Sequence, residues 1–152
     1  MQITHRENDV ILEIHAQFAS ILYIGPLVLS KEDDEEREES EFFNQKKWTD
    51  LSAQDLWDHA EAYSFFTEAA FWYFLPAVMS QSLIDFELSH LAVDRVLSRL
   101  IELTQIDDDR EKVKNCSFDK FDLVRKWLLQ IEAKAGTYGW TPRLRQIVHN
   151  IQ

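Results

Sequence analysis

The scarcity of chain breakers is the feature that most constrains what this chain can fold into. Among its 152 residues there are only three glycines and three prolines. Hairpins and tight turns depend on these residue types, so a turn-rich β fold is disfavoured and long helices are favoured. A chain of this length can bury roughly 70% of its unfolded surface, so it needs no disulfide or metal to hold it together. We therefore expect residues 1–152 to form a single helical domain.

Hydrophobic periodicity supports the helical interpretation. Residues 8–20, 86–104 and 118–135 carry apolar side chains at the three- and four-residue spacing of an amphipathic helix. The segment 68–83 is apolar nearly all round, which is typical of a helix at the centre of its domain. Pro76 lies inside this segment and removes a backbone donor, so it is expected to kink the helix. The predicted fold is all-α: a compact, irregular bundle of six or more helices around a Pro-kinked central helix.

Capping residues mark two helix starts in the middle of the chain. Ser52 with Asp55 three residues later fits a capping box and predicts a helix over 53–63. Thr67 is the expected N-cap of the central helix. The first turns of that helix carry an aromatic stripe, which is more typical of a hydrophobic core than of a ligand platform. The residues expected in the core are Phe71, Phe74 and Leu75.

Charge is distributed unevenly along the chain, whose formal net charge is −11. Residues 1–109 hold 23 acidic and 7 basic side chains, a net of −16, whereas residues 110–152 hold 4 acidic and 9 basic ones, a net of +5. Thr141 followed by Pro142 predicts a short basic C-terminal helix within 136–152. The acidic part should repel nucleic acid and anionic membranes and attract a basic protein. We therefore expect a basic protein partner, without direct nucleic-acid or membrane binding.

The strongest concentration of charge is the acidic segment 31–41, with eight carboxylates and two basic side chains. Ser30 and Asp33 fit the start of a capped helix, and Phe42 and Phe43 are expected to anchor its end on the core. Adjacent like charges repel, so the segment is either a solvated face or a surface for Lys and Arg side chains of a partner. The predicted partner-binding residues are Asp33, Asp34, Glu35, Glu36, Glu38, Glu39, Asp55 and Asp58.

Residues for catalytic or metal chemistry are absent or isolated in the sequence. Neither a glycine-rich phosphate loop nor a nucleophile elbow occurs. Cys116 is the only cysteine, which excludes an intramolecular disulfide and a Cys-based metal site, and it is interpreted as an incidental thiol. Glu87 and His90 form one Glu-x-x-His unit, but a di-metal bundle needs two such units and two further glutamates. We expect no enzymatic activity, no catalytic residues, no cofactor and no metal.

The sequence also suggests a cellular location. Residues 1–10 lack the apolar stretch of a signal peptide. Apolar runs elsewhere are interrupted well before the length that a membrane span needs. A single cysteine suits a reducing compartment, so we expect a cytoplasmic protein.

Three blocks in the middle of the chain carry a resemblance to a known family. They are Trp48-Thr-Asp-Leu51, then Ala62-Tyr-Ser-Phe-Phe66, then Ala70-Phe-Trp-Tyr-Phe-Leu-Pro-Ala77. In this order they resemble an uncharacterised family of short bacterial helical proteins, over about residues 10–135. Some members of that family lie beside toxin genes as immunity or accessory proteins. The resemblance implies such a role here, and it assigns no catalytic residues.

Small size, strong acidity and the missing catalytic chemistry favour a non-catalytic inhibitor. The leading hypothesis is a bacterial immunity protein that occludes the active site of a cognate toxin, because a carboxylate-rich surface steers association with a cationic domain. A phage-type inhibitor that mimics nucleic acid would use the same charge. The other alternative is a small-ligand module or enzyme, since a kinked apolar helix can line a pocket. That pocket would lie near His59, Trp72, Tyr73 and Pro76.

Metal content tests the interpretation of the isolated Glu-x-x-His unit. We expect protein purified without added metal to contain no stoichiometric transition metal, because one such unit supplies too few ligands. Elemental analysis makes the measurement. One tightly held transition metal per chain would overturn the interpretation of Glu87 and His90.

Overall fold

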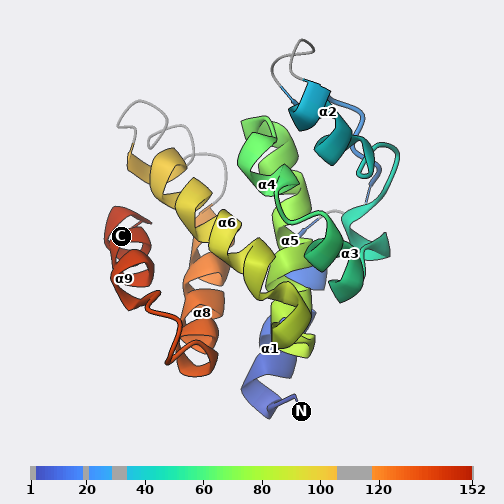
Figure 1. The fold of residues 1–152 in the computed structure, drawn as a ribbon. Helices are drawn as coiled ribbons and strands as arrows, with labels where there is room; N and C mark the ends of the chain where they lie inside the picture. The colour runs from blue at the N-terminus through green and yellow to red at the C-terminus, as the bar shows by residue number, and fades with distance from the viewer. Residues whose placement is uncertain (1–2, 19–20, 29–33, 106–117, 152) are drawn as a thin grey trace.

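The computed structural model describes residues 3–18, 21–28, 34–105 and 118–151, and within these ranges the fold is all-α (Figure 1). An isolated antiparallel bridge between Val28 and Phe66 occurs beside the helices. The predicted all-α class and the expectation of six or more helices are confirmed. The helices are α1 (His5–Gln17), α2 (Asp34–Glu41), the 3₁₀ helix η1 (Trp48–Asp50), α3 (Ala53–Asp58), α4 (Ala62–Phe65), α5 (Glu68–Ile84), α6 (Phe86–Gln105), α8 (Phe118–Lys134) and α9 (Thr141–Ile151).

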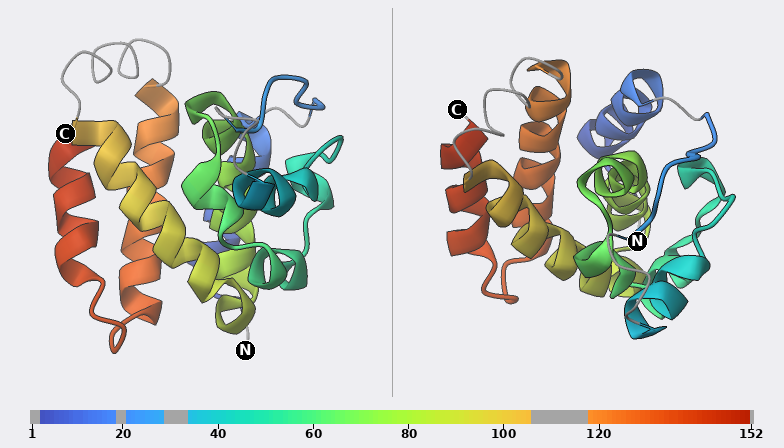
Figure 2. Two further views of the ribbon diagram at one scale, coloured as in Figure 1. Left: turned by 45° about the horizontal axis from the view of Figure 1, so that its top comes forward. Right: turned by 90° about the horizontal axis from the view of Figure 1, so that it is seen from above.

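Helix α5 is the central element of the fold. It packs against α1, η1, α3, α6 and α8, and Figure 2 shows it between α1 and α6. Eleven of its 17 residues are buried, which explains why its sequence is apolar nearly all round. Pro76 lies within the helix, and its carbonyl accepts a hydrogen bond from the Ser80 hydroxyl at 2.8 Å. The core residues predicted for this helix are all buried: Phe71, Phe74 and Leu75.

Both predicted caps are present. The Thr67 Oγ1 accepts a hydrogen bond from the backbone N–H of Ala70 at 3.1 Å, which starts α5 as expected. Ser52 and Asp55 form the predicted capping box, with reciprocal hydrogen bonds of 3.1 and 2.9 Å. Local sequence signals therefore fix where α3 and α5 begin.

The single helix predicted over 53–63 is wrong, because the structure has two short helices, α3 and α4, separated by residues 59–61. Tertiary contacts cause the break. His59 stacks on the ring of Phe42, with centroids 3.9 Å apart. Tyr63 is fully buried and donates its hydroxyl hydrogen bond to a backbone carbonyl of α5 at 2.9 Å. Burial also raises the pKa of Tyr63 well above its ordinary value, so this phenol stays protonated as a donor.

Helix α1 begins at His5, three residues before the start of the predicted segment 8–20. The earlier start follows from a capping box between Thr4 and Glu7. Glu7 is buried, and its carboxylate lies 3.0 Å from the Nζ of Lys134 at the end of α8. A buried carboxylate needs such a partner, so this ion pair joins the first helix to α8.

The helices of the acidic stretch 34–58 and those of the basic part, residues 110–152, lie on opposite sides of α5. Helices α2 and α3 occupy one side, and α8 and α9 occupy the other (Figures 1 and 2). Helix α9 begins at Thr141 and is the short basic C-terminal helix predicted within 136–152. One cluster of buried apolar side chains extends from Val10 in α1 to Ile151 in α9. None of the helices in the described ranges has the length and apolar character needed to cross a membrane.

Removing a ring from the centre of α5 tests this arrangement. We expect Phe74→Ala to lower the free energy of unfolding by about 3–5 kcal/mol, because it leaves a cavity among Tyr23, Phe43 and Phe66. Urea denaturation followed by circular dichroism makes the measurement. Leu12→Ala on α1, where the side chain is 60% exposed, is the control and should change stability by less than about 0.5 kcal/mol. An unchanged midpoint for Phe74→Ala would contradict the central position of α5.

Candidate functional site

Helix α2 presents at least three of its carboxylates to solvent. Its eight residues, DEEREESE, contain six carboxylates and one arginine. Glu35, Glu38 and Glu41 are exposed and Glu39 is half-buried, whereas Ser40 faces the core. A helix with so narrow a buried face gains little from its own burial. The carboxylates of Glu35, Glu38, Glu39 and Glu41 are called the acidic ridge below.

The acidic ridge is attached to the core by the aromatic residue that follows it. Phe43 is only 1% exposed, as expected of an anchor. Its ring packs edge-to-face against Tyr63, Phe66 and Phe74, with centroids 5.0 to 5.8 Å apart. Each edge-to-face pair contributes about 0.5–1.5 kcal/mol beyond the burial of apolar area. These contacts fix the end of α2 against α4 and α5.

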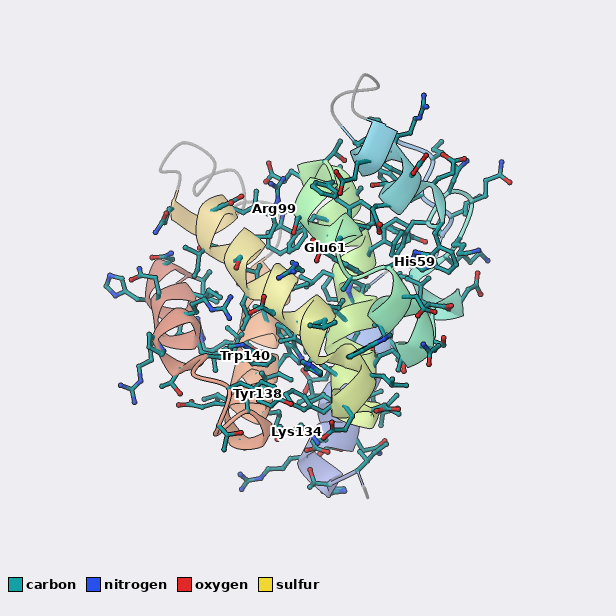
Figure 3. The ribbon with its side chains drawn as sticks, in the orientation of Figure 1. His59, Glu61, Arg99, Lys134, Tyr138 and Trp140 are labelled. Carbon is teal, nitrogen blue, oxygen red and sulfur yellow. The ribbon has the colours of Figure 1, made fainter. Side chains whose placement is uncertain are left out.

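A second aromatic contact joins the acidic ridge to α3. Phe42 stacks on His59 with an interplanar angle of 12°, and the Nζ of Lys46 lies 4.3 Å from the Phe42 ring centroid. His59 is the residue directly after α3, and the exposed Asp58 precedes it. Helix α3, which ends at the predicted partner-binding residue Asp58, therefore lies on the same side of the molecule as α2, as Figure 1 shows, and Figure 3 marks His59 there.

The remaining predicted partner-binding residues have different positions. Asp33 lies outside the described residues. Asp34 and Glu36 belong to α2, and the structure describes their backbone only. Asp55 is half-buried, and its carboxylate accepts the hydrogen bond from the backbone N–H of Ser52. Asp55 therefore has a capping role that occupies part of its carboxylate.

A shallow cavity of about 380 Å³ separates α2 from the extended segment 25–28. The hydroxyl of Ser40 is buried and has no hydrogen-bond partner. The segment itself is held to the start of α5, because the Pro26 carbonyl accepts a hydrogen bond from the Thr67 hydroxyl at 2.9 Å. The residues that line the cavity are Gly25, Pro26, Leu27, Val28, Arg37, Ser40, Glu41 and Asn44.

The residues of the alternative small-ligand pocket face different neighbours. The ring of Trp72 packs against Phe121 in α8, whereas that of Tyr73 packs against Tyr23. His59 is engaged in its stack at the end of α3. They line neither the cavity beside α2 nor a second cavity of about 290 Å³ between α8 and α9. This second cavity is lined by Leu128, Leu129, Glu132, Leu144, Arg145, Val148 and His149.

The isolated Glu-x-x-His unit lies in the first turns of α6. The Nδ1 of His90 is hydrogen-bonded to the backbone carbonyl of Glu87 at 2.8 Å. Its ring packs against Trp57 and Tyr138. Within the described ranges, no group of three His, Cys, Asp or Glu side chains is placed to hold a metal ion. Cys116 lies outside these ranges.

Comparison with known proteins gives one match. A protein-family model described as a family of unknown function, DUF6714, matches residues 28–124. The matched region begins in the segment beside α2 and ends within α8, so it includes the acidic ridge and its aromatic anchor. No curated protein and no solved structure matches the chain.

The buried hydroxyl beneath the acidic ridge gives a test of how α2 packs. We expect Ser40→Ala to leave stability unchanged or to raise it by up to about 1 kcal/mol, because the hydroxyl makes no hydrogen bond. Ser82→Ala is the matched control, since the buried Ser82 hydroxyl accepts a hydrogen bond from the Trp127 indole N–H at 2.9 Å. Its loss should cost about 1–3 kcal/mol. If urea denaturation showed that both variants lose the same free energy of unfolding, the buried and unbonded position of the Ser40 hydroxyl would be contradicted.

Proposed function

Since the chain belongs to DUF6714, a family of unknown function, we propose a function from its own surface: it is a non-catalytic inhibitor that binds a basic protein through the acidic ridge. The observation that carries the proposal is that this ridge lies on a helix held by buried aromatic rings, with Glu38 and Glu41 exposed. Neither of these two carboxylates has an ion-pair partner among the described residues.

Elsewhere in the fold, charged side chains form ion pairs. Several basic side chains outside α2 pair with carboxylates, including Lys126 with Glu13 and Arg99 with Glu102. Residues 34–61, in contrast, contain ten carboxylates and three basic side chains. Concentrating like charge on one side opposes folding, so the arrangement is better explained by binding than by stability. A fixed row of carboxylates attracts a cationic surface and accelerates encounter with it.

A bacterial toxin domain with a basic active-site cleft is the partner class that fits this surface best. Such a cleft concentrates positive potential, and α2 is a short projecting element that could cover it. The protein would then act as an immunity protein, by occlusion and without chemistry of its own. Long-range attraction makes the association rate strongly dependent on ionic strength, because exposed charges are screened over about 8 Å at physiological salt.

Neutralising six carboxylates of the acidic segment 31–41, five of them in α2, tests the proposal. Wild-type protein and a six-fold variant are used as paired baits in a lysate of the native host, and the purified partner is then mixed with each in stopped-flow experiments. We expect association to slow by at least about tenfold at low salt, a modest share of the range that electrostatic steering supplies. The wild-type protein should also inhibit the activity of the captured partner. The substitutions are Asp33→Asn, Asp34→Asn, Glu35→Gln, Glu36→Gln, Glu38→Gln and Glu39→Gln.

A control variant removes six negative charges elsewhere on the molecule. It should associate at nearly the wild-type rate if position matters as well as net charge, and circular dichroism checks that both variants stay folded. A six-fold variant that associates as fast as wild type would make the ridge a solubilising face only. A captured partner whose activity is unaffected would contradict inhibition. The control residues, each replaced by its amide, are Asp9, Glu13, Glu68, Glu102, Asp122 and Glu132.

A further inference from the structure

Three partly exposed aromatic side chains form a continuous row across the start of α6. Trp57 and Tyr138 are each 41% exposed. The ring of His90 lies between them, 5.6 Å from Trp57 and 5.3 Å from Tyr138 between centroids. The three residues come from α3, α6 and the connection between α8 and α9, and they are called the aromatic band below. Large aromatic side chains left in solvent on adjoining elements are typical of a binding surface.

Two buried aromatic residues support one end of the aromatic band. Phe86 and Trp140 are buried beneath it, and both pack against Tyr138, with centroids 5.5 and 5.1 Å apart. Gly139 has a φ of 70°, a left-handed conformation that favours glycine, and it lies between the two aromatic residues of this connection. Figure 3 shows Tyr138 and Trp140 on the side of α6 where α8 and α9 lie, away from α3. This packing holds the ring of Tyr138 in position without a ligand.

The hydrogen bonding of His90 leaves an acceptor in the middle of the aromatic band. Its Nδ1 lies 2.8 Å from the backbone carbonyl of Glu87. A carbonyl can only accept a hydrogen bond, so Nδ1 carries the proton, and the Nε2 of the neutral ring is an acceptor. The faces of Trp57 and Tyr138 attract cations electrostatically. A ligand that fits must combine positive charge, N–H donors and a surface that stacks on rings.

The charges near the aromatic band favour a cation as well. Arg95 on α6 forms ion pairs with Glu61 and Asp94, and Arg143 on α9 forms one with Asp94, so these two basic side chains are compensated by two carboxylates. Glu87 is exposed and has no ion-pair partner among the residues that the structure describes. It precedes His90 by three residues on the same helix, a spacing at which side chains are neighbours. The band therefore has an exposed carboxylate beside it on α6.

We propose that the aromatic band binds an arginine side chain of a basic protein partner. A guanidinium is planar, so it can stack on one of the two rings that flank His90 and contact the other, while its N–H groups reach the His90 Nε2 and the Glu87 carboxylate. A lysine ammonium offers no flat surface for stacking and binds such a site less well. Trp, Tyr and Arg are the residue types that dominate binding energy at protein interfaces. The identity of the partner rests on the proposed function, whereas the chemistry of the site does not.

The test uses short peptides and needs no knowledge of the partner. Three glycine-rich peptides that differ at one position, carrying arginine, lysine or the uncharged isostere citrulline, are titrated into the full chain. NMR follows the indole and ring resonances of Trp57, His90 and Tyr138. We expect the arginine peptide to shift these resonances, the lysine peptide to bind more weakly, and the citrulline peptide to bind at least about tenfold more weakly, since it loses the charge. Equal binding of arginine and citrulline peptides would overturn the proposal, and equal binding of lysine would overturn the choice of arginine.

Variants identify the site. We expect Trp57→Leu and Tyr138→Leu each to weaken arginine binding by about fivefold or more, whereas Trp57→Phe, which keeps a ring, should restore most of it. Glu87→Gln should weaken binding, and its matched control Glu132→Gln, an exposed carboxylate on α8, should change it by less than about twofold. Unchanged binding in both leucine variants would overturn the proposal. Each variant is checked for a native circular dichroism spectrum.

The outcomes separate this inference from the proposed function. The six-fold variant of the acidic segment should still bind the arginine peptide at the aromatic band, within about twofold, because local contacts rather than long-range attraction hold it. Peptide shifts that map to α2 instead would overturn the inference. Normal peptide binding together with unchanged partner association in the six-fold variant would overturn the proposed role of the ridge and leave the aromatic band intact.

Discussion

The packing of Phe43 into the aromatic cluster is the interaction on which the candidate site depends. Helix α2 carries six carboxylates, and of its side chains that the structure describes only Ser40 is fully buried, so these side chains give it little apolar contact of its own. The buried ring that follows it contacts Tyr63, Phe66 and Phe74, which belong to or border α4 and α5. This anchor offsets the mutual repulsion of the carboxylates and gives them fixed positions. The acidic ridge is thus a consequence of core packing.

The parts of the fold that follow from local physics could be predicted from the sequence. The apolar run of α5 and the caps at Ser52 and Thr67 depend on neighbours within one or two turns. The earlier start of α1 could also be predicted from the sequence, because Thr4 and Glu7 have capping-box spacing. The break after α3 could not be predicted, because the stack that lies at it joins Phe42 and His59, which come from separate segments of the chain. Whether Pro76 kinks α5 stays a prediction.

The candidate site was predictable in its charge but not in its geometry. Counting carboxylates identifies α2, and the capping box indicates the role of Asp55, but neither can show that α3 ends on the same side of the molecule as the ridge. The aromatic band could not be predicted from the sequence. Its residues, Trp57, His90 and Tyr138, are far apart in the chain and come together only in the folded structure. In the proposed function, the acidic ridge would supply long-range attraction and the aromatic band short-range contacts, the division of roles found at many protein interfaces.

Native-state hydrogen exchange of the free protein tests most directly whether the acidic ridge is a fixed structure. If Phe43 holds α2 in place, the amides of residues 38–41 in the wild-type protein exchange more slowly than those of an unfolded chain. In Phe43→Ala these amides should lose their protection while the amides of α6 (Phe86–Gln105) keep most of theirs. Exchange of the α2 amides at the unfolded-chain rate in the wild-type protein would contradict the account, because the carboxylates would then have no fixed arrangement to present to a partner.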